Sequence, residues 1–234
     1  MNEQPRYAIY FAPAPGSALA AFGSAVLGYD PHSGAEAPIA AGLAQSFPSW
    51  RSHVAEPSRY GFHATLKAPF SLAAGLREFD LLDAAAALAG RLEPEALGVL
   101  DVAAMHRFVA LLPRDPQAGA RSARVIVGDL DHLRAPLSDA DRVRRLQAPL
   151  TPRQIAHLDR WGYPYVMDEH RFHMTLAGPL EVDAITRVSD ALARHYAAAC
   201  TPTTIDAITI FKQETRAQRF VAIERFQFLG AAAA

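Results

Sequence analysis

Residues 60–69 of this 234-residue chain read Tyr-Gly-Phe-His-Ala-Thr-Leu-Lys-Ala-Pro, and residues 170–179 read His-Arg-Phe-His-Met-Thr-Leu-Ala-Gly-Pro. The two stretches align without a gap and share Phe, His, Thr, Leu and Pro at equivalent positions. Because the chain holds only nine His and nine Thr residues, random placement predicts fewer than one His-x-Thr triplet. A matched pair with the same flanks therefore indicates an internal duplication.

The pattern of apolar residues after each motif predicts a helix followed by two strands. The predicted elements are a helix over 76–92 with strands over 98–104 and 107–112, and a helix over 182–199 with strands over 203–212 and 219–228. The expected apolar face of the first helix is Leu76, Phe79, Leu82, Ala86 and Leu88, and that of the second is Ile185, Val188, Leu192 and Tyr196. The sequence therefore predicts a duplicated α+β unit, with repeats at about 59–113 and 170–229.

Further elements are expected outside the repeats: a strand over 6–12, a helix over 17–27 capped by Ser17, and helices over 120–133 and 152–161 joined by a Pro- and Arg-rich stretch. No segment resembles a long flexible linker, so residues 1–234 are expected to form a single domain of two intertwined lobes. The tail Ala231–Ala234 is expected to be frayed.

Alternation along the motif strands separates an apolar face from a reactive one. His63, Thr65 and Lys67 are predicted on one face of the first strand, and Arg171, His173 and Thr175 on one face of the second. Two imidazoles brought together near neutral pH can act as a general base and a general acid in one turnover. Threonine hydroxyls can donate hydrogen bonds to phosphoryl oxygens. His63, Thr65, His173 and Thr175 are therefore the candidate catalytic residues, without a required metal.

Basic residues near the motifs are candidate phosphate ligands. Lys67 is one of only two lysines beside 21 arginines, which favours a specific role for its ammonium group. Arg171 is a second candidate for substrate binding, and Arg59 and Tyr60 are expected to border the pocket. The cluster of Arg142, Arg144 and Arg145 is interpreted as a solvated face.

Composition narrows the class of protein. The formal net charge of −1 argues against a non-specific DNA or membrane binder. The sequence contains no run of about 20 uninterrupted apolar residues, so no membrane-spanning helix is predicted. The single cysteine, Cys200, excludes an internal disulfide and a cysteine-based zinc site, and no third His or carboxylate recurs at metal-ligand spacing. The expectation is a cytoplasmic protein without a bound metal or cofactor.

The two His-x-Thr motifs resemble those of the 2H phosphoesterase superfamily, whose members include 2′-5′ RNA ligase-like proteins and cyclic nucleotide phosphodiesterases. The stretches 59–69 and 171–179 are most similar to the bacterial branch associated with carbon–phosphorus lyase genes and phosphonate metabolism. The resemblance covers essentially the full chain. It implies a bilobal pseudo-twofold structure with two antiparallel sheets facing a central cleft, helices outside, and His63, Thr65, His173 and Thr175 converging in that cleft.

The resemblance also implies hydrolysis of a phosphodiester or cyclic phosphate, with a small ribose-derived cyclic phosphate favoured by the phosphonate association. Two alternatives stay open. An RNA-end 2′,3′-cyclic phosphodiesterase or RNA ligase-like enzyme would need a basic, aromatic-lined groove leading away from the histidines. A phosphate-ligand binding module without turnover would keep the fold but leave the ligand intact. The sequence does not assign the acid and the base between the two histidines.

Overall fold

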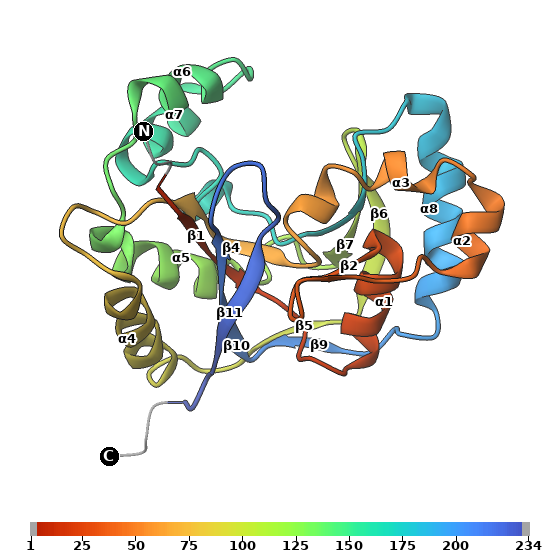
Figure 1. Cartoon of the computed structure of the whole chain (residues 1–234), viewed down its shortest axis with the longest axis horizontal. Helices are drawn as coiled ribbons and strands as arrows, with labels where there is room; N and C mark the ends of the chain where they lie inside the picture. Colours follow the sequence, from red (N-terminus) through yellow and green to blue (C-terminus); the bar gives the residue numbers. More distant parts are fainter. Residues whose placement is uncertain (1–3, 231–234) are drawn as a thin grey trace.

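The computed structural model describes residues 4–230, so the expectation for the Ala231–Ala234 tail lies outside the described residues. Its centre is one antiparallel seven-stranded sheet (Figure 1). In spatial order the strands are β11 (Val221–Gln227), β10 (Ala207–Gln213), β1 (Arg6–Phe11), β4 (Ala64–Phe70), β8 (Met174–Ala177), β7 (Phe108–Pro113) and β6 (Leu100–Met105).

The resemblance implied two separate antiparallel sheets, whereas the structure joins the long strands of both halves in one sheet. Strands β6 and β7, which follow β4 in the chain, and strands β10 and β11, which follow β8, belong to one continuous sheet, joined where β4 meets β8. That junction is short, since its backbone register consists of a single pair, Ala64 with Met174. Both side chains of this pair are fully buried on the apolar face, as alternation predicts.

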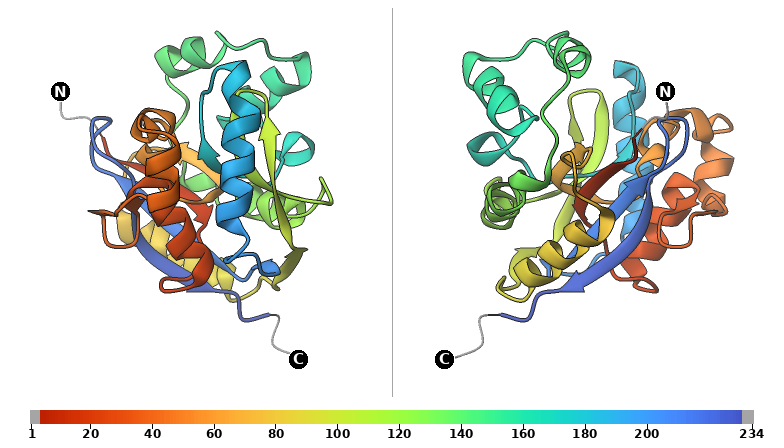
Figure 2. Two further views of the ribbon diagram at one scale, coloured as in Figure 1. Left: turned by 90° about the vertical axis from the view of Figure 1, so that its right-hand side faces the viewer. Right: turned by 60° about the vertical axis from the view of Figure 1, so that its left-hand side comes forward.

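Helices cover the sheet (Figure 2). The longer ones are α1 (Ala18–Leu27), α4 (Glu78–Ala89), α5 (Ala120–Asp129), α7 (Pro152–Trp161) and α8 (Val182–Tyr196). The shorter elements are β2 (Tyr29–Asp30), β3 (Ala35–Glu36), α2 (Ala41–Ser46), α3 (Trp50–His53), η1 (Pro57–Arg59), β5 (Glu95–Gly98), η2 (Asp131–Leu133), α6 (Asp139–Arg145), η3 (Met167–Glu169) and β9 (Thr203–Ile205). In the part of the chain described, no helix has the length and apolarity needed to cross a membrane.

The two halves of the chain exchange helices. Helix α4 follows the first motif strand but packs on β10 and β11, which follow the second motif. Helix α8 follows the second motif strand and packs on β6 and β7, which follow the first. Strands β5 and β9, one from each half, also pair with each other. The apolar faces of α4 and α8 are therefore buried by contacts between the two halves.

Local sequence signals set most element boundaries. The Ser17 side chain accepts a hydrogen bond from the Ala20 N–H and caps α1, as predicted. Thr151 and Gln154 form a capping box at the start of α7, with Pro152 in the first turn. The expected apolar face of α4 was partly wrong. Phe79 is 45% exposed and stacks against Arg77, and Ala86 is exposed as well. The buried face consists of Leu81, Ala85, Leu88 and Ala89.

Candidate active site

The side chains of both His-x-Thr motifs line one cavity of about 620 Å³. The antiparallel pairing of Ala64 with Met174 explains their convergence. In that register His63 lies beside Thr175, and Thr65 lies beside His173. Because Ala64 and Met174 point into the core, the four flanking side chains point to the opposite face. The short junction between β4 and β8 therefore brings the two motifs together.

The two imidazoles are held in the same way. The Nδ1 atom of His63 lies 2.8 Å from the carbonyl oxygen of Gly61, and that of His173 lies 2.8 Å from the carbonyl oxygen of Arg171. A carbonyl oxygen only accepts hydrogen bonds, so Nδ1 carries the proton in each neutral ring. The Nε2 lone pair is consequently left to exchange a proton with a ligand.

Neighbouring residues fix the His63 ring further. Tyr10 of β1 stacks on it, with ring centroids 3.7 Å apart and planes 23° apart. The Thr65 hydroxyl lies 3.3 Å from Nε2 and donates to it. Gly61, whose carbonyl anchors the ring, has a left-handed φ of +76°, and a Cβ there would lie 2.5 Å from Pro31. The sequence signal for Gly61 and Tyr10 was too weak to assign them to the site.

Burial lowers the pKa of both histidines. It brings the pKa of His63 to about 4, against an opposing effect of the Gly61 hydrogen bond and with a further lowering by the charge of His173. Burial also lowers the pKa of His173, partly offset by the Arg171 carbonyl. Both rings are therefore neutral at pH 7 in the free protein, and the two sites are close enough to influence each other's titration.

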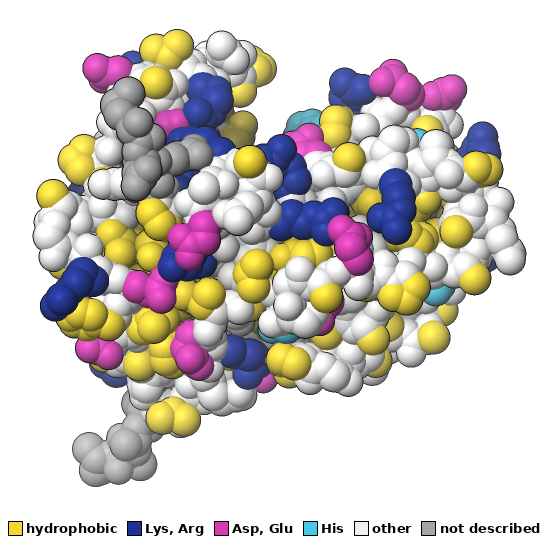
Figure 3. Space-filling model, in the orientation of Figure 1, with side chains coloured by type: hydrophobic (Ala, Val, Ile, Leu, Met, Phe, Trp, Pro, Cys, Tyr) yellow, Lys and Arg dark blue, Asp and Glu magenta, His cyan; other side chains and the backbone are white. Residues whose placement is uncertain are grey.

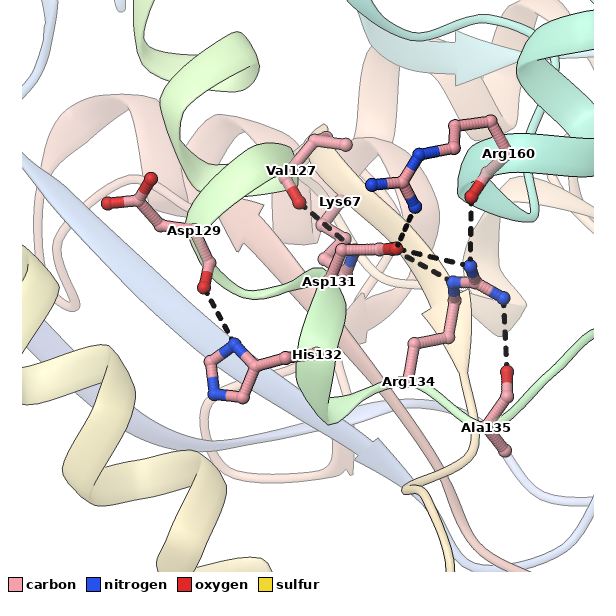
Figure 4. A network of polar contacts seen from close by, with 8 residues as sticks. All are labelled: Lys67, Val127, Asp129, Asp131, His132, Arg134, Ala135 and Arg160. Atoms are coloured by element: carbon pink, nitrogen blue, oxygen red, sulfur yellow. Dashed lines mark hydrogen bonds and ion pairs between the residues drawn. The ribbon is translucent and has the colours of Figure 1, made fainter.

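The structure places Lys67 outside this cavity. Between Thr65 and Lys67 the register with β1 shifts by one residue, so a β-bulge reverses the side-chain alternation. Lys67 is buried and its Nζ lies 3.0 Å from an Asp131 carboxylate oxygen, in a network with Arg134 and Arg160 (Figure 4). The prediction that Lys67 shares a face with His63 and Thr65 was wrong for this reason.

Arg171 precedes β8 and borders an adjoining cavity of about 330 Å³, which His173 and Thr65 also line. Its guanidinium donates to the carbonyl oxygens of Asp168 and His170 and is exposed. His170 is buried, and its Nε2–H donates to the carbonyl oxygen of Thr65 at 3.1 Å. This bond ties the segment before the second motif to the first motif strand.

Arginines from four distant segments line the histidine cavity. They are Arg6 of β1, Arg59 of η1, Arg144 and Arg145 of α6, and Arg216 between β10 and β11. Tyr60, Tyr163 and Tyr10 lie among them. Arg144 and Arg145 thus border the cavity, and the Arg144 side chain is 52% exposed, in line with the solvated face interpreted from the sequence. Arg142 is not among the lining residues and pairs with Asp159 at 2.7 Å. Figure 3 shows Lys and Arg side chains between the α6–α7 end and the middle of the face drawn.

Within residues 4–230, no group of three or more His, Cys, Asp or Glu side chains is arranged to hold a metal ion. The same residues contain one cysteine, Cys200, which is a free and exposed thiol.

Comparison with known proteins identifies the family. Residues 65–221 match the family described as "Protein of unknown function (DUF1045)". The chain belongs to the DUF1045 family. It is 38% identical over 234 residues to a Janthinobacterium protein named ribose 1,5-bisphosphate phosphokinase PhnN, an alignment that covers 96% of this chain and 51% of the relative. It is 35% identical over 208 residues to a Laribacter hongkongensis protein of the same name, covering 88% of this chain and 48% of the relative. The chain thus spans about half the length of these curated relatives.

Proposed function

We propose that this DUF1045 protein is a phosphodiesterase that opens a small cyclic phosphate by paired-histidine acid–base catalysis, without a metal ion. The observation that carries the proposal is the matched anchoring of His63 and His173. Each ring is fixed through Nδ1, which leaves two Nε2 atoms and two threonine hydroxyls to one cavity. The resemblance to the 2H phosphoesterase superfamily supports the same chemistry, and we extend it to a pseudo-twofold duplication of the two halves.

The proposed mechanism gives different roles to the two histidines. His63 is the deeper ring, with a pKa of about 4, and acts as the base. Its Nε2 takes a proton from a water molecule as the water oxygen attacks phosphorus. The phosphorus–oxygen bond on the opposite side breaks, and His173, which has taken up a proton from solvent in the substrate complex, gives its Nε2 proton to the departing alkoxide. A bound phosphate anion favours the imidazolium form of His173 and so opposes the lowering of its pKa by burial.

The remaining residues position and stabilise the reacting group. The Thr65 hydroxyl bonds to His63 in the free site, and we propose that it turns to a non-bridging phosphoryl oxygen when substrate binds. Thr175 is placed to do the same from the other strand. Tyr10 does not touch the substrate's reacting atoms in this scheme; it is a positioning residue that holds the His63 ring plane.

The proposed substrate is a ribose-derived cyclic phosphate. Both relatives are named for ribose 1,5-bisphosphate, a pentose that carries two phosphates. Hydrolysis of a 5-phosphoribosyl 1,2-cyclic phosphate at the O2–phosphorus bond would yield that compound. The kinase in the relatives' name belongs, in this proposal, to the half that this chain does not match. Neither lysine here follows a glycine, so the chain has no phosphate-binding loop of the Gly-x4-Gly-Lys type.

The test is hydrolysis by EDTA-treated protein, followed by ³¹P NMR. The panel contains 2′,3′-cyclic nucleotides, ribose 1,2-cyclic phosphate with and without a 5-phosphate, and a short RNA that ends in a cyclic phosphate. Opening of a cyclic phosphate by the wild type, and its loss in His63→Ala and His173→Ala, would support the scheme. Binding of these compounds without turnover would instead favour a phosphate-ligand binding module.

An RNA-end phosphodiesterase is the second candidate function. One specific observation favours it: arginines and tyrosines surround the histidine cavity, as a single-stranded RNA groove would require. The net charge of −1 gives no general attraction to a polyanion. The RNA in the panel decides between the two, because this function predicts that it is the best substrate and that its hydrolysis falls steeply with salt.

A further inference from the structure

The histidine cavity carries more positive charge than one phosphodiester needs. Five arginines line it, whereas Glu56 is the one acidic residue among the described residues that do so. A phosphodiester or a cyclic phosphate contributes a single negative charge. Bringing several guanidinium groups together costs electrostatic free energy, which an anionic ligand would offset.

Two of these arginines, Arg6 and Arg59, hydrogen-bond to neutral groups. Arg6 donates to the neutral side chain of Gln213, with Nε at 2.9 Å, and Arg59 donates to the main-chain oxygen of Arg216 at 2.6 Å. Arg144 and Arg216 share one carboxylate, Asp141, at 2.5 and 3.2 Å. The contacts of Arg6 and Arg59 orient their guanidinium groups without neutralising them.

Arg145 is the most exceptional member of the group. Its Nε is buried yet has no hydrogen-bond partner, although unsatisfied buried donors are rare in folded proteins. Its guanidinium carbon lies 5.0 Å from the centroid of the Tyr163 ring, which holds the group in place without neutralising it. A planar guanidinium presents its N–H donors in a fork that matches the oxygens of a phosphate group.

The pKa values of two arginines reflect this crowding. Burial lowers the pKa of Arg145, and the neighbouring charge of Arg144 lowers it further. Burial also lowers the pKa of Arg6, with additional lowering by Arg216 and Arg144. Arg6 lies on β1 and Arg144 on α6, so the charges that act on each other come from separate parts of the fold that meet at this cavity.

We propose that Arg6, Arg144 and Arg145 form a second phosphate subsite, which binds a phosphate group of the substrate other than the one attacked between the histidines. The substrate class is then a small bis-phosphorylated molecule: a cyclic phosphodiester at one end and a phosphomonoester dianion at the other. This inference rests on the proposed function for the identity of the reacting end. The cavity volume of about 620 Å³ is in the range of sites for small molecules.

The kinetic test compares two substrates that differ by one group, ribose 1,2-cyclic phosphate with and without a 5-phosphate. The wild type should prefer the 5-phosphorylated compound, and Arg145→Gln or Arg6→Gln should lower that preference, as a ratio of kcat/KM values, by about tenfold. Arg142→Gln is the matched control, because Arg142 is on the same helix but faces Asp159. An unchanged ratio in both cavity variants would overturn the subsite.

A binding measurement separates this inference from the proposed chemistry. Calorimetric titration of wild type, Arg145→Gln and Arg142→Gln with ribose 1,5-bisphosphate and with ribose 1-phosphate needs no turnover. The subsite predicts tighter binding of the bisphosphate by wild type and Arg142→Gln, with the difference lost in Arg145→Gln. Equal affinities for the two ligands in the wild type would refute it even if cyclic phosphates are hydrolysed. A preference for the RNA substrate that depends on Arg145 would assign these arginines to an RNA backbone instead.

Discussion

Replacement of Asp131 by Asn tests the buried ion pair that Lys67 forms outside the histidine cavity. The side chains of Lys67 and Asp131 are only 4% and 11% exposed, and Nζ lies 3.0 Å from the carboxylate. In Asp131→Asn the Lys67 ammonium loses its counter-ion and keeps a distant contact with the carbonyl oxygen of Val127 at 3.5 Å. An uncompensated buried charge of this kind costs about 3–5 kcal/mol. Because the Asn oxygen still accepts one hydrogen bond, we expect about 3 kcal/mol.

Lys67→Met should cost less, about 1–2 kcal/mol, because Asp131 keeps ion pairs with Arg134 and Arg160. Burial alone would raise the pKa of Asp131, but the Arg134 hydrogen bond and the Lys67 charge together hold it below its ordinary value. The charge of Asp131 thus remains balanced without the lysine. The order of the two costs is as informative as their sizes.

The assay is urea unfolding at pH 7, together with kcat/KM on the best substrate of the panel. Asp129→Asn is the matched control, since its pair with Arg91 is exposed and should contribute under about 1 kcal/mol. A cost below about 1 kcal/mol for Asp131→Asn would refute the buried-pair reasoning. So would a large loss of kcat/KM in Lys67→Met without a loss of stability, which is the behaviour expected of a phosphate ligand.

Three further predictions concern the histidines. His63→Ala and His173→Ala should each lower kcat by about 10²–10⁴-fold while unfolding in urea as the wild type does; near-normal turnover of either variant would disprove the paired scheme. Burial holds the pKa of His63 at about 4, below its ordinary 6.5, so the unfolded chain takes up the proton first as the pH falls. The contribution of neutral His63 to the free energy of unfolding should therefore be fully present above about pH 6.5 and decrease as the pH falls towards 4. Urea unfolding at pH 7 and pH 5 measures this loss, which should be smaller in His63→Gln; an identical loss in the two proteins would contradict the assignment. Tyr10→Leu should lower kcat about tenfold with little change in KM, whereas Tyr10→Phe keeps the stacked ring and should stay close to wild type.

Local features of the sequence were sufficient to predict most of the elements. Hydroxyl caps at Ser17 and Thr151 set helix starts, because the orphan N–H groups of a first turn need an acceptor that is near in sequence. The alternation in both motif strands likewise predicted an apolar face with Ala64 and Met174 and an opposite face with the His-x-Thr side chains. These signals depend on the period of the backbone, which neighbouring residues determine.

The exchange of helices between the two halves could not be predicted from such short-range signals. Either amphipathic helix could have packed on the strands that follow it directly. Only the complete sheet shows that α4 covers β10 and β11 while α8 covers β6 and β7. The joining of the halves into one sheet through Ala64 and Met174 is a tertiary outcome of the same kind.

By itself, then, the sequence determined the duplicated motifs, the four residues that line the cavity and the residue types available for acid–base chemistry. The tertiary structure alone decided on which side of the sheet Lys67 lies, because a one-residue bulge against β1 reverses alternation without any mark in the sequence. It alone brought Arg6, Arg145 and Arg216 to one cavity from positions far apart in the chain. The physical reason is the same in both cases: alternation and capping act over a few residues, whereas the side on which a charge is placed depends on contacts between distant segments.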